Sequence, residues 1–365
     1  MSCTEFDLII AGAGPAGLAT AIQAALAGLE PVVLERRRGD LDKACGEGLM
    51  PGAVASLEAM GVLLAPQESQ QFHGIRYLCG RLSAEGRFRR GTGLGVRRTV
   101  LSNALQSRAA ELGVEIRLGC PVESWEDDGA SVSVCTAEAT LCGRYLIAAD
   151  GLHSRIRRQA GLDRRQGRVG RLYHRFGVRR HYSVCLWTDL VEVHLADSVE
   201  AYVTPVGPDT IGVALLFGPV EGDVTFEALL ERFPALQERL ASATGLDVSL
   251  GAGPFRQRVR RRFAGRVALV GDAAGYFDAL TGQGLDLSFA SSSALVDVIR
   301  AGESLDEYER AYRRLVRRYR ATVELVLHVV RRRASRAGMV RLLRAHPSLF
   351  GRLLDAVGGQ SSGSR

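Results

Sequence analysis

A chain of 365 residues can form one large domain or two medium ones around a sizeable core. It is 46% hydrophobic and 24% charged, which is the balance of a globular protein rather than of a disordered or fibrous one. The net charge of +7 comes from arginine, because Lys43 is the only lysine. The arginines are scattered and not interleaved with aromatic residues, so we expect no nucleic-acid partner.

The cysteines and the N-terminus bear on compartment and metal content. The 7 cysteines lack CxxC or Cys/His spacing, so we expect no metal site and no disulfide framework. The acidic residues Glu5 and Asp7 lie where a secretory signal peptide would carry positive charge. The expected localisation is therefore cytoplasmic.

The chain opens with a pattern of strand, glycine turn, helix and strand. Residues 6–11 are short and apolar, which predicts a buried strand. An Ala/Leu-rich helix follows to about residue 28, and a second strand over 31–34 ends at Glu35. The turn between the first strand and the helix reads Gly12-Ala13-Gly14-Pro15-Ala16-Gly17.

This turn has the Gly-x-Gly-x-x-Gly spacing of dinucleotide-binding proteins. Gly12 permits the tight turn, Gly14 lets the backbone approach a pyrophosphate, and Gly17 lets the helix pack on the strand. The amides at the helix N-terminus favour the phosphates. Glu35 stands where an acid accepts hydrogen bonds from ribose hydroxyls. The pattern predicts a dinucleotide site.

Further elements follow in chain order. We expect a helix over 101–112, a strand over 114–118, a strand or hairpin over 130–142 and a buried strand over 146–149. Strand-like runs over 171–217, notably 190–194 and 211–217, indicate an inserted antiparallel sheet, followed by a helix over 226–240 and a parallel strand over 267–270. After Gly284 the chain is expected to be helical, with breaks near Gly302 and Pro347. The Gly/Ser-rich residues 358–365 are expected to be disordered.

Two later segments resemble motifs of flavin-dependent aromatic hydroxylases and their relatives. Residues 147–158, with Asp150-Gly151, resemble the Asp-Gly motif, and 265–275 resemble the second FAD motif, in which Asp272 would contact the ribityl chain. The run 281–284 would open a helix whose N-terminal amides face the flavin, where reduced flavin carries negative charge. Arg98 resembles the arginine that reaches the cofactor phosphates, and Arg97 is the alternative.

The run 43–51 resembles the Cys-Gly-rich segment beside the flavin in geranylgeranyl reductases. By that resemblance Cys45 would be a proton donor or a wall of the pocket, and Glu47 an acid/base group. The alternative is a tight glycine loop around an inert cysteine. Tyr202, in the Tyr-Val-Thr-Pro run at 202–205, falls where those reductases have a substrate-lining segment, and is a further candidate proton donor.

The resemblance implies an FAD-dependent oxidoreductase of the geranylgeranyl reductase and class A flavin monooxygenase superfamily. The residues expected at FAD are Gly12, Gly14, Pro15, Ala16, Gly17, Glu35, Arg36, Cys45, Gly46, Arg98, Asp150, Gly151, Gly271, Asp272, Gly282, Gln283, Gly284 and Leu285. The candidate catalytic residues are Cys45, Glu47 and Tyr202. Trp125 and Trp187 are the only tryptophans, so the Trp-rich segment of the superfamily's halogenases is absent.

The expected fold class is α/β, with a Rossmann-like, glutathione-reductase-type FAD-binding domain, an inserted antiparallel-sheet substrate domain and C-terminal helices. The FAD-binding domain would comprise residues 1–75, 95–165 and 255–305. The substrate domain would comprise 76–94 and 166–254, followed by a helical segment over 306–357 and the tail.

Two reactions remain open from the sequence. The first is monooxygenation, the hydroxylation or epoxidation of an apolar small molecule with NAD(P)H and O2. The alternative is reduction of a carbon–carbon double bond, or, in a different class, a flavin-binding protein without turnover. Since no second glycine fingerprint follows a strand, NAD(P)H would bind only transiently, or another protein would supply the electrons. The basic helical pattern over 307–346 is expected to pack on the body, with weak peripheral membrane contact as the alternative.

Overall fold

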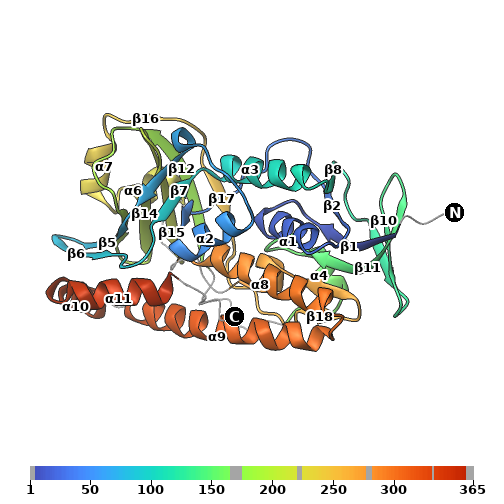
Figure 1. The fold of residues 1–365 in the computed structure, drawn as a ribbon. Helices are drawn as coiled ribbons and strands as arrows, with labels where there is room; N and C mark the ends of the chain where they lie inside the picture. The colour runs from blue at the N-terminus through green and yellow to red at the C-terminus, as the bar shows by residue number, and fades with distance from the viewer. Residues whose placement is uncertain (1–4, 165–174, 220–223, 277–281, 331–332, 359–365) are drawn as a thin grey trace.

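The computed structural model describes residues 5–164, 175–219, 224–276, 282–330 and 333–358 (Figure 1). Two sheets lie side by side, and long helices run along one side of both. The prediction of an α/β fold with a second, mainly antiparallel sheet and C-terminal helices is confirmed.

The first sheet has the order β18-β19-β11-β1-β2-β8, with β10 and β9 continuing from β11. Its strands are β1 (Glu5–Ala11), β2 (Pro31–Glu35), β8 (Glu115–Leu118), β9 (Ser124–Asp127), β10 (Val132–Cys135), β11 (Thr140–Ala148), β18 (Phe263–Ala264) and β19 (Val267–Leu269). The central strands β2, β1, β11 and β19 run parallel. Because parallel strands end at the same edge, the turns after β1, β11 and β19 meet there.

Helices cover this sheet and bury its apolar faces. They are α1 (Pro15–Leu26), α2 (Pro51–Ala59), α3 (Arg98–Glu111), α4 (Arg155–Gln159), α8 (Gly284–Arg300) and α9 (Leu305–Val330), with the short turns η1 (Pro66–Glu68) and η2 (Gly271–Ala274). The helices α1 and α8 pack together, and Thr20 donates a hydrogen bond to Ser292 between them at 2.9 Å. Tyr308 and Tyr312 of α9 are buried, and Tyr308 donates to the Leu269 carbonyl.

The second sheet has the order β16-β12-β15-β14-β13-β5-β6, with β17 paired to β12. Its strands are β5 (Gly74–Cys79), β6 (Leu82–Arg87), β12 (Phe176–Ser183), β13 (Val191–Leu195), β14 (Val199–Gly207), β15 (Thr210–Phe217), β16 (Thr244–Gly245) and β17 (Leu250–Ala252). All pairs are antiparallel except β13 with β5. One face is covered by α6 (Phe226–Leu230) and α7 (Pro234–Leu240).

A small sheet lies where the two large ones meet. It consists of β3 (Gly48–Leu49), β7 (Gly93–Val96) and β4 (Ser69–Phe72), all antiparallel. The Cβ of any other residue at Gly95 would lie 1.7 Å from the Pro205 carbonyl oxygen of β14. Glycine is therefore required where this small sheet meets β14.

The C-terminal helices α10 (Arg333–Ala345) and α11 (Pro347–Val357) pack on the β5–β6 hairpin (Figure 1). The rings of Phe350 and Tyr77 stack with centroids 5.3 Å apart. Gly86 makes room for this contact, because a Cβ there would lie 2.6 Å from the Phe350 ring. The helices are thereby fixed against the second sheet.

Some element predictions need correction. The single helix expected over 226–240 is two helices, since Pro234 starts a new one. The strand expected over 146–149 is the end of β11, which begins at Thr140 and forms a hairpin with β10. The breaks near Gly302 and Pro347 are confirmed. The predicted domain boundaries remain a prediction, and all of the predicted disordered tail except Gly358 lies outside the described residues.

Two remaining features of the structure concern a disulfide bond and the length of the apolar helices. Cys142 is disulfide-bonded, contrary to the expectation that the cysteines form no disulfide framework. In the described parts of the chain, no helix combines the length and the apolar character needed to cross a bilayer.

Candidate functional site

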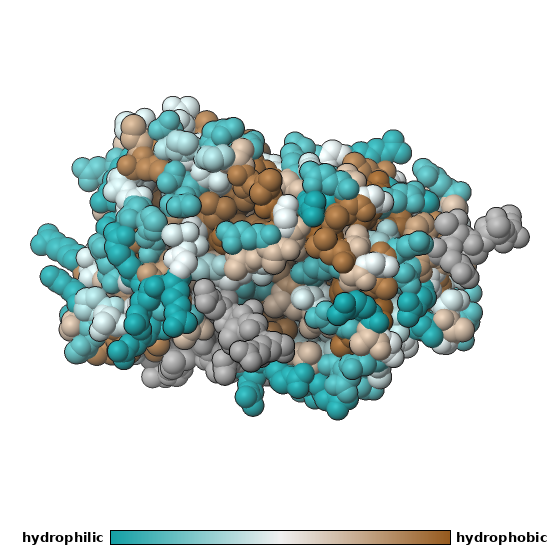
Figure 2. Space-filling view, in the orientation of Figure 1, coloured by the Kyte–Doolittle hydropathy of each residue, from teal (hydrophilic) through white to brown (hydrophobic). Residues whose placement is uncertain are grey.

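A cavity of about 840 Å³ connects the two large sheets. One end is lined by the glycine turn after β1, the loop at 41–48, the Asp150 turn and the start of α8. The other end is lined by strands of the second sheet and by α10 and α11. In the space-filling view, hydrophobic residues gather in the middle of the face shown, between hydrophilic ones (Figure 2).

The glycine turn has the stereochemistry that its motif requires. Gly12 has φ of 110°, and a Cβ at Gly17 would lie 1.9 Å from the Gly12 carbonyl oxygen. A Cβ at Gly14, by contrast, would meet no atom within 4 Å. Gly12 and Gly17 are thus required by the fold itself, whereas Gly14 borders open space in the cavity.

Helix α1 directs free backbone donors at this space. It begins at Pro15 after the N-cap Gly14, and no side chain caps its first amides. The Glu35 carboxylate instead accepts hydrogen bonds from the Ala13 and Arg37 amides, at 2.8 and 2.9 Å. Glu35 therefore fixes the glycine turn, and both it and Arg36 line the cavity.

The two later motifs meet beside this turn. Arg157 is buried and its guanidinium donates to the carbonyls of Leu152 and Ala273, which joins the Asp150 turn to η2. Asp272 lines the cavity and pairs with Lys43, with Nζ and Oδ2 2.6 Å apart. At α8, Gly284 and Leu285 line the cavity, and no side chain caps the helix.

The polar groups around the cavity fit FAD. Among the described residues, Asp150 Oδ1 and Arg98 Nε are buried without a hydrogen-bond partner. Gly46, Gly151, Gly282 and Gly284 also border open space, since a Cβ on any of them would meet no atom within 4 Å. The uncapped α1 suits a pyrophosphate, and the uncapped α8 suits the electron-rich edge of a flavin.

Most residues expected at the cofactor line this cavity. The exceptions are Gly17 and Gly271, whose roles are steric, and the buried Gln283. Arg98 lines the cavity whereas Arg97 forms an ion pair with Asp247, so the structure brings Arg98 to the site.

Arg98 lies against Cys45. Burial disfavours the charged form of Arg98, but the hydrogen bond and charge of Cys45, together with Glu47 and Asp272, raise the pKa of the guanidinium. Arg98 thus stays cationic beside Cys45.

Glu47 and Tyr202 line the same cavity as Cys45. Glu47 is buried with φ of 56° and accepts a hydrogen bond from the Arg98 amide at 2.8 Å. On the facing strand β14, Thr204 donates to the Gly46 carbonyl at 2.8 Å. Cys45 and Glu47 therefore lie on one loop of the cavity lining, and Tyr202 lines the same cavity from β14.

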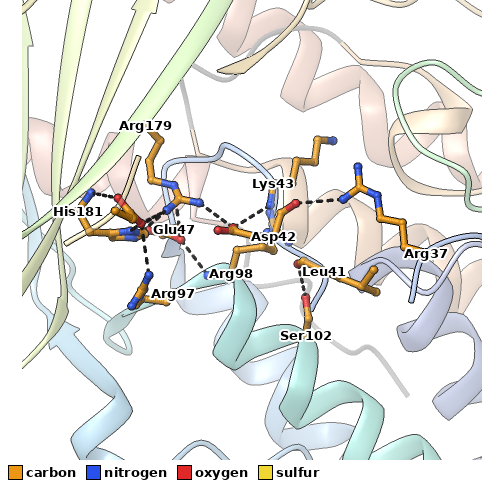
Figure 3. A network of polar contacts seen from close by, with 11 residues as sticks. Arg37, Leu41, Asp42, Lys43, Glu47, Arg97, Arg98, Ser102, Arg179 and His181 are labelled. Carbon is orange, nitrogen blue, oxygen red and sulfur yellow. Dashed lines mark hydrogen bonds and ion pairs between the residues drawn. The ribbon is translucent and has the colours of Figure 1, made fainter. Parts of the chain in front are cut away.

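The sequence analysis missed the polar cluster behind Glu47. Figure 3 shows His181 and Arg179 meeting Glu47 at one end of a row of polar contacts. The row continues from Arg179 to Asp42, whose side chain accepts from the Lys43 amide and whose carbonyl accepts from Arg37. His181 and Arg179 belong to β12, far from Glu47 in the chain. The sequence shows that Arg179 and His181 are two positions apart and so lie on the same face of a strand, but no neighbouring residue indicated what they contact.

The far end of the cavity is apolar. Its lining residues from the second sheet and the C-terminal helices are Ile75, Tyr77, Val191, Val193, Met339, Leu342, Leu343, Leu349, Phe350, Leu353 and Leu354. Leu342, Leu349 and Leu353 are also exposed, at 53%, 39% and 47%. The apolar end is therefore continuous with an apolar patch on α10 and α11.

Comparisons with known proteins identify the family of the chain. The family described as FAD binding domain matches residues 5–196. A digeranylgeranylglycerophospholipid reductase of Methanopyrus kandleri is 30% identical, over 83% of this chain and 78% of its own length. A menaquinone reductase of Mycolicibacterium smegmatis is 28% identical, over 87% of this chain and 82% of its own length.

Solved structures share the fold. A flavoprotein/dehydrogenase from Cytophaga hutchinsonii superposes with a TM-score of 0.83 at 19% identity, covering 96% of this chain and 92% of that one. The flavin-dependent brominase Bmp2 superposes with a TM-score of 0.84 at 18% identity, covering 98% and 94%.

These matches define the class as FAD-dependent oxidoreductases. The chain belongs to the FAD-binding domain family. Within the superfamily of geranylgeranyl reductases and class A flavin monooxygenases, it belongs to the geranylgeranyl reductase branch.

Proposed function

We propose that this protein is an FAD-dependent reductase of an apolar, isoprenoid-like molecule. The sequence analysis placed monooxygenation first and reduction second. Reduction now ranks first, because the relatives matched over most of the chain are named as reductases of a menaquinone and of an isoprenoid lipid.

The observation that carries the proposal is the continuity of the cavity. One cavity joins the glycine turn and α8 to the apolar strands of the second sheet and to α11. A long apolar substrate can thus lie with one end at the flavin and its chain along the second sheet. Burial of apolar surface contributes about 25 cal/mol per Å² to such binding.

In this scheme the cofactor, two side chains and the apolar lining of the cavity each have a role. FAD, when bound and reduced by a transient donor such as NAD(P)H, supplies a hydride. Cys45 and Tyr202 line the cavity, which supports them as the candidate donors of the accompanying proton. The apolar lining excludes water, so that the reducing equivalents reach the substrate.

The test is an anaerobic single turnover. Protein loaded with FAD and reduced by dithionite is mixed with menaquinone or digeranylgeranylglycerophospholipid in detergent. The molecular masses of the products are then measured by mass spectrometry. We expect flavin reoxidation together with a product that has gained two hydrogen atoms. A product that gains an oxygen atom, and only when O2 is added, would overturn reduction and establish the monooxygenase instead.

The patch on α10 and α11 suggests where an apolar substrate enters. Leu342, Leu349 and Leu353 are exposed and line the cavity, and the exposed Arg341, Arg344 and Arg352 lie beside them in sequence. Apolar residues flanked by arginine suit weak contact with an anionic membrane surface. Flotation with anionic liposomes tests this: salt-sensitive binding lost in L349S/L353S is expected, and equal binding of that variant contradicts it.

A further inference from the structure

His181 lies between two carboxylates. Its Nε2 is 2.6 Å from Glu47 Oε2, and its Nδ1 is 2.5 Å from Asp247 Oδ2 (Figure 3 shows the Glu47 side). Arg179 Nη1 also lies 2.6 Å from Nδ1, so a carboxylate and a guanidinium meet at that nitrogen. The geometry is a continuous chain of proton carriers from Glu47 to Asp247.

The three groups differ in access to water. The side chains of Glu47 and His181 are each 1% exposed, whereas that of Asp247 is 21% exposed. Glu47 lines the cavity, and neither His181 nor Asp247 does. The three side chains therefore lead from the cavity wall, at Glu47, through the buried imidazole of His181 to Asp247, a carboxylate that water reaches.

Further charges surround this chain from several elements. Arg179 Nη1 is 3.1 Å from Asp247 and its Nη2 is 2.6 Å from Asp42, while its Nε is 3.9 Å from Glu47. Arg97 Nη2 is 3.3 Å from Asp247. The guanidinium groups of Arg97 and Arg179 thus lie among the carboxyl groups of Asp42, Glu47 and Asp247, which lowers the cost of burying them. Arg98 and Cys45 lie beyond Glu47 on the cavity side.

We propose that Asp247, His181 and Glu47 form a proton relay from solvent to the cavity wall. This rests on the proposed redox function of the cavity. When an acceptor there takes a hydride from reduced flavin, it also needs one proton. The acceptor takes that proton from the donor on the cavity wall, Cys45 or Tyr202, and Glu47 replaces it with the proton that it receives from His181 Nε2. In the same step His181 Nδ1 takes a proton from Asp247, which water has protonated. One proton enters for each hydride transferred, and a half-turn of the imidazole ring restores the starting tautomer.

The relay is tested with 2-methyl-1,4-naphthoquinone, a soluble acceptor of a hydride and a proton. Dithionite-reduced, FAD-loaded protein is mixed with it anaerobically in H2O and in D2O, and flavin reoxidation is followed. We expect H181Q and D247N to slow reoxidation about tenfold or more, to change its pH profile and to alter its solvent isotope effect. Added imidazole is expected to restore the rate of H181G.

The matched control is H194Q. His194 is also buried on the second sheet and lies 3.3 Å from a carboxylate, that of Glu192, but it does not line the cavity. FAD affinity should be unchanged in all these variants. Wild-type rates in H181Q and D247N, equal slowing in H194Q, or no reoxidation of the wild type by the naphthoquinone overturns the relay. Failure of the wild type with the lipid probes alone overturns only the proposed substrate class.

Discussion

Lys43 and Asp272 are 229 positions apart, yet their side chains form an ion pair of 2.6 Å on the wall of the cavity. Lys43 lies in the loop after β2, and Asp272 is the second residue of η2, which follows β19. The parallel sheet brings these two strand ends to the same edge. The pair thus joins the Cys45 loop to the segment that resembles the second FAD motif.

Lys43 is the only lysine, and this makes it a chemical reporter of the site. Since it lines the cavity and is 45% exposed, amine-reactive acylation of Lys43 should be rapid in the apoprotein and several-fold slower with FAD bound. Peptide mass spectrometry of samples taken over time measures both rates. Acylation of the N-terminal amine provides the internal control, and equal rates at Lys43 with and without FAD would contradict the assignment of the cavity.

The glycine turn offers a matched pair of substitutions. G14V places its side chain in open space, so FAD affinity should fall at least about tenfold while the thermal stability of the apoprotein changes little. G17A forces a methyl group against the Gly12 carbonyl oxygen and should destabilise the apoprotein by about 1–3 kcal/mol. Thermal unfolding and fluorescence titration with FAD separate the two effects. Destabilisation by G14V equal to that by G17A would show that Gly14 is a folding glycine only.

Cys45 is expected to act in turnover rather than in cofactor binding. C45A should lower the rate of substrate reduction by about 10²-fold, the lower end of what general acid catalysis contributes, and leave FAD bound. The exposed Cys185 lies outside the cavity lining, so C185A serves as the control. The rate of substrate reduction in a single turnover is measured for both variants. Equal rates in C45A and C185A would show that Cys45 only lines the cavity and takes no part in the reaction. Y202F tested alongside shows which of the two side chains donates the proton.

Acid stability should depend on Glu192. Burial alone raises the pKa of this carboxyl, but hydrogen bonds from His194, Trp187 and Arg76 outweigh it and lower the pKa to about 2. A lowered folded pKa stabilises the protein above the unfolded value of 4.5, and this contribution is lost as pH falls through about 2. E192Q should therefore cost about 3 kcal/mol at pH 7 and progressively less below pH 4.5.

Urea unfolding at several pH values measures this dependence. The exposed Glu231 provides the control variant E231Q, which should follow the wild-type curve. A constant difference between E192Q and wild type from pH 7 to pH 3 would mean that the carboxylate charge contributes nothing.

The local features of the FAD site could be predicted from the sequence. Gly12, Gly14 and Gly17 have steric and conformational roles that depend on residues near them, and the strand and helix on either side have clear periodicity. The Asp150 and Asp272 segments resemble known motifs, and the structure brings both to the edge where β1 ends. The single helix expected over 226–240 was wrong for a local reason, because Pro234 begins a new helix.

What the sequence determined by itself was the set of short-range requirements: where glycine must stand, where helices begin, and which acids end strands. Only the tertiary structure decided that His181 meets Glu47, 134 positions away, and that Asp247 completes the chain from the other side. The physical reason is that a buried charge needs a partner of opposite sign, and the register of β12 in the second sheet sets which one is within reach. The joining of the FAD end to the apolar end of the cavity likewise depends on how the sheets and the C-terminal helices pack.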